Sequence, residues 1–171
     1  PDKFEQSILP QKSPKYWSKM PVRTTMAGTG RSSSVAPWEG HKAIELDLED
    51  LDEVEKVVSG LGIVHILVNN SGGPPGGPLL ENELDDFEGP FRRHLHASHV
   101  ITKALVPKME SEGTGRIVNI ISTSVREPID NIGLSNTLRG AMASWSKSMS
   151  RELPPCITIN NILPGRTRVP E

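Results

Sequence analysis

Two rhythms of hydrophobic and polar positions alternate along residues 41–171. Short apolar runs predict strands at residues 42–46, 64–68, 116–121 and 157–163. Between them, apolar residues recur every three or four positions, which predicts helices at residues 49–59, at 83–109 with an interruption at 89–90, and at 135–153. This order is typical of right-handed crossovers in a parallel sheet, so the sequence predicts an α/β fold.

The run at residues 64–68 is apolar at almost every position, which is typical of a strand covered on both faces of its sheet. A polar and glycine-rich segment, residues 69–77, follows it, and we expect neither a helix nor a strand to continue there. Polar or glycine-containing segments also follow the other predicted strands. Ligands of parallel α/β sheets bind beyond the carboxyl ends of the strands, so we expect the functional site at this edge.

Residues 1–40 differ from the rest of the chain in composition and in their lack of a regular hydrophobic pattern. Prolines interrupt them, residues 28–34 are rich in serine and glycine, and no hydrophobic period is sustained. Residues 22–26 could form one short strand. Residues 27–31 hold two closely spaced glycines, but no predicted strand precedes them and no helical pattern follows, as a phosphate-binding turn requires. We therefore divide the chain into an irregular segment, residues 1–40, and an α/β domain, residues 41–171.

Composition narrows the classes of function. The chain has 19 basic and 21 acidic residues, a net charge of -2, which argues against a nucleic-acid-binding protein. Its apolar runs are far shorter than the roughly 20 residues that cross a bilayer, so we expect no membrane span. The single cysteine, Cys156, favours a reducing compartment such as the cytoplasm. His94 and His96 fall on different helix faces, so we expect no metal site.

Four segments, in this order, carry a resemblance to the short-chain dehydrogenase/reductase family. They are residues 47–48 (DL), 67–72 (LVNNSG), 115–122 (GRIVNIIS) and 160–165 (NNILPG). Residues 69–74 (NNSGGP) and 134–139 (LSNTLR) resemble a divergent branch described as 3-oxoacyl-acyl-carrier-protein-reductase-like. The resemblance implies a Rossmann-like doubly wound sheet with flanking helices, truncated or altered at the N-terminus and incomplete at both ends.

The resemblance also implies a set of catalytic positions. Ser122 matches the family's catalytic serine, and the family's asparagine position falls at His94. The family's tyrosine and lysine positions are occupied by Ser135 and Arg139. An unassisted serine is a much weaker acid than a tyrosine phenol, and arginine stays charged, so Arg139 can offer positive charge but no proton relay. His94, with an ordinary pKa near 6.5, is the substitute acid that we predict.

NAD or NADP is the cofactor that the resemblance implies, with a small carbonyl or alcohol as substrate and a homo-oligomer, dimer or tetramer, as the assembly. The cofactor-binding residues that it implies are Asp47, Leu48, Asn70, Ser71, Gly72, Arg139, Pro164, Gly165 and Thr167. We expect weak cofactor binding, because residues 1–40 offer no glycine-rich turn at a helix N-terminus.

Three hypotheses remain open at this point. The first is a divergent oxidoreductase of this family that acts on a carbonyl or alcohol. The second is a catalytically degenerate pseudoenzyme, a binding or structural subunit that has lost the tyrosine and lysine. The third is a partial gene product whose fold a partner completes. Cofactor binding without turnover would favour the second, and no cofactor binding would favour the third.

Overall fold

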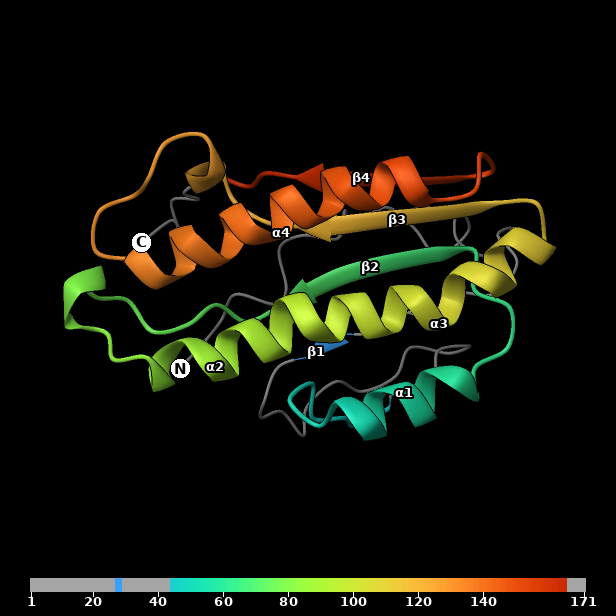
Figure 1. Ribbon diagram of the computed structural model, residues 1–171, viewed down its shortest axis with the longest axis horizontal. Helices are drawn as coiled ribbons and strands as arrows, with labels where there is room; N and C mark the ends of the chain where they lie inside the picture. The colour runs from blue at the N-terminus through green and yellow to red at the C-terminus, as the bar shows by residue number, and fades with distance from the viewer. Residues whose placement is uncertain (1–26, 29–43, 166–171) are drawn as a thin grey trace, which may run out of the picture.

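The computed structural model describes residues 27–28 and 44–165, and Figure 1 shows its elements. In chain order these are β1 (Ala27–Gly28), α1 (Leu51–Ser59), β2 (Ile66–Ser71), α2 (Asp85–Phe91), α3 (Ala97–Ser111), β3 (Gly115–Ile120), α4 (Gly133–Glu152) and β4 (Ile157–Ile162). The four strands form one sheet in the order β1-β2-β3-β4, and every neighbouring pair is parallel. The predicted Rossmann-like parallel sheet with flanking helices is confirmed.

One face of the sheet carries the core. The helices α1, α3 and α4 lie on this face (Figure 1), and α1 packs against α3. Leu67, Ile117 and Ile157 point from β2, β3 and β4 into a cluster with Val54 of α1 and Leu105 of α3. The stripes of apolar residues that predicted these helices are therefore the surfaces that the helices bury.

Side chains that alternate with the core residues point to the opposite face of the sheet. On that face Ile66 is 44% exposed and Ile162 is 51% exposed. The prediction that the run at 64–68 is covered on both faces is therefore wrong for Ile66. Val64 is buried, but it precedes β2, which begins at Ile66. Its burial therefore belongs to the loop before the strand, and the apolar run 64–68 does not report two covered faces of one strand.

Both ends of α1 are capped by side chains. Asp50 accepts a hydrogen bond from the Glu53 amide at 3.0 Å, and so satisfies one of the free donors of the first turn. At the other end Lys108 of α3 donates to the carbonyls of Ser59 and Leu61, at 2.8 and 2.5 Å. Its charge meets the negative end of the helix dipole, so α3 holds α1 by electrostatics as well as by apolar contact.

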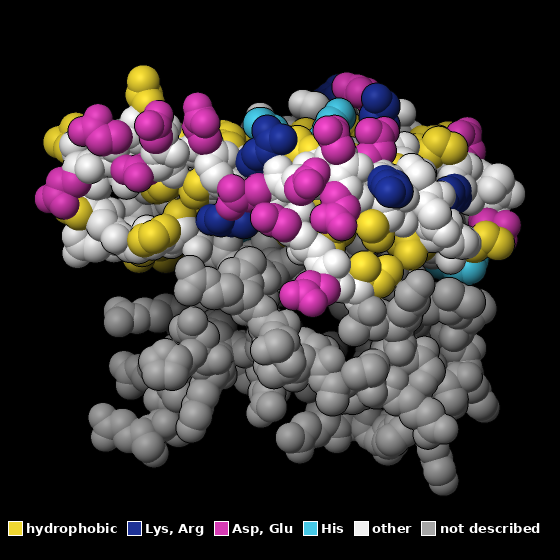
Figure 2. All heavy atoms as spheres, turned by 90° about the horizontal axis from the view of Figure 1, so that it is seen from below, with side chains coloured by type: hydrophobic (Ala, Val, Ile, Leu, Met, Phe, Trp, Pro, Cys, Tyr) yellow, Lys and Arg dark blue, Asp and Glu magenta, His cyan; other side chains and the backbone are white. Residues whose placement is uncertain are grey.

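The face in Figure 2 carries many acidic side chains, with Lys or Arg side chains between them. Acidic residues stand in the first turn of both helices: Asp52 and Glu53 in α1, and Asp85, Asp86 and Glu88 in α2. There their negative charges interact favourably with the positive end of each helix dipole. Within the described ranges no helix is both long and apolar enough to cross a membrane.

Three asparagines in register join the central strands beneath α4. Asn119 of β3 lies opposite Asn69 of β2 and Asn161 of β4. Its carbonyl accepts from the Asn69 amide at 2.8 Å, and its amide donates to the Asn161 carbonyl at 3.0 Å and to Ser146 Oγ at 3.3 Å. Asn119 is fully buried, and this side chain uses both amide hydrogens and its oxygen.

Strand predictions need three corrections. Residues 44–46 form no strand, because no described strand pairs with them, and residues 42–43 and 22–26 lie outside the described part of the chain. β2 continues through Asn69 and Asn70 to Ser71, because these residues pair with β1 or β3 despite their polarity. Of the segment predicted to be irregular, the structure describes Ala27–Gly28, which pair in parallel with Asn70 and Ser71.

The long helical region departs from its prediction at one place. Gly89 and Pro90 lie inside α2 and do not interrupt it. The irregularity follows them, as a π-helical turn at Arg92–His96 that runs into α3. In this turn the amide of Ala97 donates to the carbonyl of Arg92, five residues earlier, so one extra residue is accommodated without a break.

Asn119→Ala should destabilise the protein by about 2–4 kcal/mol, because it leaves the half-buried amides of Asn69 and Asn161 without their common partner. The free energy of unfolding in urea measures this. The matched control is Asn160→Ala on β4, whose side chain is exposed and should change stability by no more than about 0.5 kcal/mol. Equal losses from the two variants would contradict a special role for the asparagine ladder.

Candidate functional site

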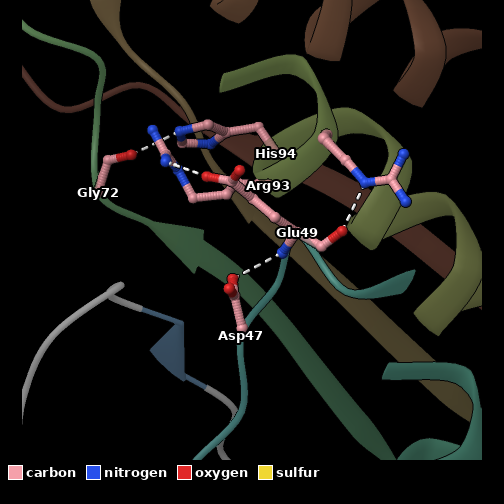
Figure 3. A network of polar contacts seen from close by, with 6 residues as sticks. Asp47, Glu49, Gly72, Arg93 and His94 are labelled. Carbon is pink, nitrogen blue, oxygen red and sulfur yellow. Dashed lines mark hydrogen bonds and ion pairs between the residues drawn. The ribbon is translucent and has the colours of Figure 1, made fainter. Parts of the chain in front are cut away.

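His94 ties the helical layer to the carboxyl end of β2. Its Nδ1 lies 2.6 Å from Ser71 Oγ, and its Nε2 lies 2.6 Å from the carbonyl oxygen of Gly72 (Figure 3). His94 is only 2% exposed. Both ring nitrogens are therefore engaged by the segment that the sequence pattern marked as cofactor-facing.

These partners fix the tautomer of the ring. The Gly72 carbonyl can only accept, so Nε2 carries the proton and donates it. In the neutral ring Nδ1 is then the acceptor, and the Ser71 hydroxyl donates to it. Burial, and next the nearby positive charge of Arg139, lower the pKa of His94 from 6.5 to about 4. His94 is neutral at neutral pH, and its contacts favour a positioning role over the general acid predicted from the sequence.

The π-helical turn explains how consecutive residues serve two different parts of the site. Within it His94 is buried toward β2, while Arg93 forms an ion pair with Glu49 in the loop before α1. Arg92 donates from Nε to the Glu49 carbonyl at 2.5 Å. A π turn shifts the helical register by one residue, and such turns occur frequently at functional sites.

Asp47 belongs to the same network but is turned to solvent. Its carboxylate accepts from the Glu49 amide at 2.9 Å, and its side chain is exposed (Figure 3). Asp47 thus shapes the loop that Arg92 and Arg93 hold, and among the described residues only one of its carboxylate oxygens, Oδ1, accepts a hydrogen bond.

A small cavity lies between this loop, β2 and α3. Leu48, Asn70 and Ser71, three of the predicted cofactor-binding residues, line it together with Arg93. Its volume of about 20 Å³ is enough for one water molecule. The structure therefore brings these residues together around one small space.

Arg139 and Ser135 lie across the strand end from His94. Arg139 donates to the Ile120 carbonyl at 3.0 Å and to the Ser71 carbonyl at 3.5 Å, and so bridges the ends of β3 and β2. Gly73 faces both side chains: a Cβ at this position would lie 3.8 Å from Arg139 Nη2 and 4.0 Å from Ser135 Oγ. Burial lowers the pKa of Arg139 from its ordinary value, without removing its charge at neutral pH.

Ser122 follows β3 at the same edge. Its Oγ accepts from the Ser124 amide at 3.1 Å and caps a short 3-10 turn, so its own hydroxyl hydrogen remains available to a ligand. Pro164 accepts at its carbonyl from the Thr123 amide at 3.1 Å, which places Pro164 and Gly165 beside this turn. Thr167 lies outside the described residues.

Two residues of this site were not singled out from the sequence. Arg93 borders the cavity, but an arginine on a helix usually indicates no more than a solvated face. Gly73 leaves open the space in front of Arg139 and Ser135, but within a glycine- and proline-rich run it is indistinguishable from a turn glycine. One sequence signal could have drawn attention to Gly73. Ser135 and Arg139 stand one helical turn apart on one helix face, and a residue facing that pair from a strand end needs a small side chain.

Comparison with known proteins gives a consistent result. The family description "short chain dehydrogenase" matches residues 35–170. The dehydrogenase/reductase SDR family member 4 of Sus scrofa is 32% identical over 148 residues, which cover 84% of this chain and 51% of that protein. Carbonyl reductase [NADPH] 2 of Sus scrofa is 28% identical over 127 residues, 73% of this chain and 52% of that protein. The chain thus spans about half the length of these relatives.

Among solved structures, a short-chain dehydrogenase from Streptomyces avermitilis is similar to this chain with a TM-score of 0.75 and 27% sequence identity. The similarity covers 84% of this chain and 57% of that one. The fold and the order of the motif segments along the chain therefore point to the same family.

The protein should become less stable as the pH is lowered through the range where His94 titrates. The folded pKa of about 4 lies below the ordinary value of 6.5, so the unfolded chain binds the proton more tightly. The stabilisation from neutral His94 is complete above about pH 6.5 and is lost as the pH falls toward 4. Between pH 7.5 and 5 we expect a loss of about 2 kcal/mol in the free energy of unfolding.

Urea unfolding of His94→Asn at both pH values checks this, since asparagine keeps a donor and an acceptor but does not titrate. The loss of stability with falling pH should shrink by about 2 kcal/mol in this variant and stay unchanged in His96→Asn, which removes an exposed histidine. An unchanged pH dependence in His94→Asn would show that another group is responsible.

Proposed function

The chain belongs to the short-chain dehydrogenase family, and on that premise we propose that it transfers hydride between a nicotinamide cofactor, NAD or NADP, and a small carbonyl or alcohol. The observation that carries this proposal is the convergence of Ser71, Gly72, His94, Ser135 and Arg139 at the carboxyl ends of β2 and β3. In a parallel α/β sheet this edge is where ligands bind.

The cofactor half of the proposal rests on Leu48, Asn70 and Ser71, which would contact the adenosine part, with Asp47 beside them. Pro164 and Gly165 would contact the part nearer the reacting atoms, and we extend this role to Thr167 from the resemblance alone. The polar side chains suit ribose hydroxyls, whereas the cavity of about 20 Å³, which Arg93 borders, has no room for an adenine as it stands. The bound cofactor supplies the hydride, and the protein supplies binding, orientation and electrostatics.

Around the substrate, the chain offers a hydroxyl and a positive charge. Ser122 has a free hydroxyl hydrogen to donate to a carbonyl oxygen, and Arg139 keeps its charge at this edge. His94 holds the end of β2 in place and keeps it from shifting as ligands bind. A tyrosine is absent from this set, so the proton that completes the alcohol would come from solvent.

Members of this family typically act on small molecules and oligomerise. We infer a homodimer, or a tetramer built from it, through α3 and α4. Trp145 of α4 donates to His99 of α3 at 3.4 Å, which joins the outer sides of the two helices into one surface. A self-complementary surface of this kind is most often used in a two-fold dimer. We place the protein in the cytoplasm, because its one cysteine favours a reducing compartment.

Cofactor binding should be weak, with a dissociation constant of about 1 mM for NADPH or NADH, equivalent to about -4 kcal/mol. Arg93→Ala should strengthen binding, by about tenfold at most, because it removes the side chain that borders the cavity. Fluorescence titration measures both, with Lys103→Ala on the exposed side of α3 as the control. Micromolar binding by the unchanged chain, or weaker binding by Arg93→Ala, would contradict this account of the cavity.

Turnover should depend on Ser122 more than on Ser135. A positioned hydrogen-bond donor to a developing oxyanion contributes roughly 10²–10³-fold, so Ser122→Ala should lower kcat/KM by about 10² or more. Ser148→Ala, an exposed serine at the far end of α4, is the control. NADPH oxidation with a panel of small aldehydes and ketones provides the assay. Binding of NADPH with no oxidation of it by any of these substrates would favour the pseudoenzyme hypothesis instead.

A further inference from the structure

The charge of Arg139 has no negative partner among the described residues. Its hydrogen bonds go to two backbone carbonyls, those of Ile120 and Ser71, which are neutral. Within residues 27–28 and 44–165 there is one ion pair, between Arg93 and Glu49, and it does not involve Arg139. A guanidinium that is half-buried without a carboxylate carries a desolvation penalty that an anionic ligand would offset.

The space in front of this guanidinium is open. Gly73 is exposed, and the position of its missing Cβ lies 3.8 Å from Arg139 Nη2 and 4.0 Å from Ser135 Oγ. A cationic donor and a hydroxyl donor therefore converge on one point at the surface. Any side chain at residue 73 would occupy that point, so the glycine keeps it free.

Nearby acceptors are already used, which removes the main obstacle to an anion. The carbonyl of Ser71 accepts from Arg139, and the carbonyl of Gly72 accepts from His94. His94 itself is neutral, and the charges of Arg139 and Arg93 both lower its pKa. Within 4 Å of a Cβ on Gly73, the described neighbours outside its own chain segment are thus Arg139 Nη2 and Ser135 Oγ, both able to donate to an anion.

We propose that Arg139 and Ser135, beside Gly73, bind a carboxylate of the substrate, so that the substrates are oxo acids and the corresponding hydroxy acids. This inference rests on the proposed oxidoreductase function and narrows its substrate class. Arginine offers a planar pair of N–H donors that matches the two oxygens of a carboxylate, which the rounded ammonium of a lysine does not. Arg139 is a substrate-binding residue in this account, and Ser122 is left to contact the carbonyl.

Calorimetry without cofactor tests the site directly. The probes are pyruvate, acetoacetate and 4-oxopentanoate, each compared with its neutral methyl ester. At least one of the acids should bind about tenfold to a hundredfold more tightly than its ester, as expected for a hydrogen bond to a charged group. Equal binding of acids and esters, or no binding of any acid, would overturn the proposal.

Variants locate the binding. Arg139→Gln keeps amide hydrogens but removes the charge, and should abolish the preference for acids. Gly73→Ala adds a methyl group at ordinary contact distance, so it should fold normally and still weaken acid binding about fivefold or more by filling the space. The matched control is Arg126→Gln. Arg126 is an exposed arginine that directly follows the 3-10 turn Thr123–Val125, and this variant should bind acids like the unchanged chain. Circular dichroism and the urea midpoint report folding, and unchanged acid binding in a folded Gly73→Ala would overturn the proposal.

Two further arms separate a substrate carboxylate from a cofactor phosphate. Saturating NADPH should leave acid binding intact, and inorganic phosphate should compete weakly. Displacement of the acids by NADPH, or tighter binding of phosphate than of any acid, would assign the anion to the cofactor and overturn the proposal. NADPH oxidation is measured separately. Equal turnover of esters and acids would refute the carboxylate site and support the oxidoreductase function. Binding of acids without any turnover would support the carboxylate site and refute the oxidoreductase function.

Discussion

The buried amide of Asn119 is the constraint on which the geometry of this domain depends. A parallel sheet can slip by two residues without exchanging its faces, and apolar side chains alone resist such a slip only weakly. An amide that must satisfy two strands and Ser146 of α4 at once has one acceptable register. That register sets the ends of β2, β3 and β4 relative to one another, and Ser71, Ser122 and Pro164 stand at or just beyond those ends.

A second polar network builds on this register at the edge of the sheet. His94 and Arg139 approach the end of β2 from two different helical segments and take up the carbonyls of Gly72 and Ser71. Two backbone carbonyls and the Ser71 hydroxyl are held in this way, so the path of the chain at residues 71–72 is set by hydrogen bonds from two helical segments. The edge is therefore organised before any ligand arrives, which is the general requirement for a site that orients a reacting group.

Replacement of the family's tyrosine and lysine positions changes the chemistry of this edge in a concerted way. A lysine beside a tyrosine lowers the pKa of the phenol, but a serine hydroxyl at position 135 has no accessible pKa to adjust. The cation at Arg139 is then released from that task, and it is held instead by carbonyls of two strands. If Ser135 and Arg139 hold the family's tyrosine and lysine positions, as the resemblance implies, the proposed carboxylate site would replace a proton relay by a site for negative charge.

The sequence by itself determined the alternation of helices and strands, the parallel sheet and the edge that carries the site, because these follow from local periodicity and from the chirality of crossovers. Tertiary structure decided the rest. Only pairing with neighbouring strands extends β2 to Ser71, and only burial beside Arg139 makes His94 neutral. These properties depend on groups far apart in the chain, whose distances no local pattern contains.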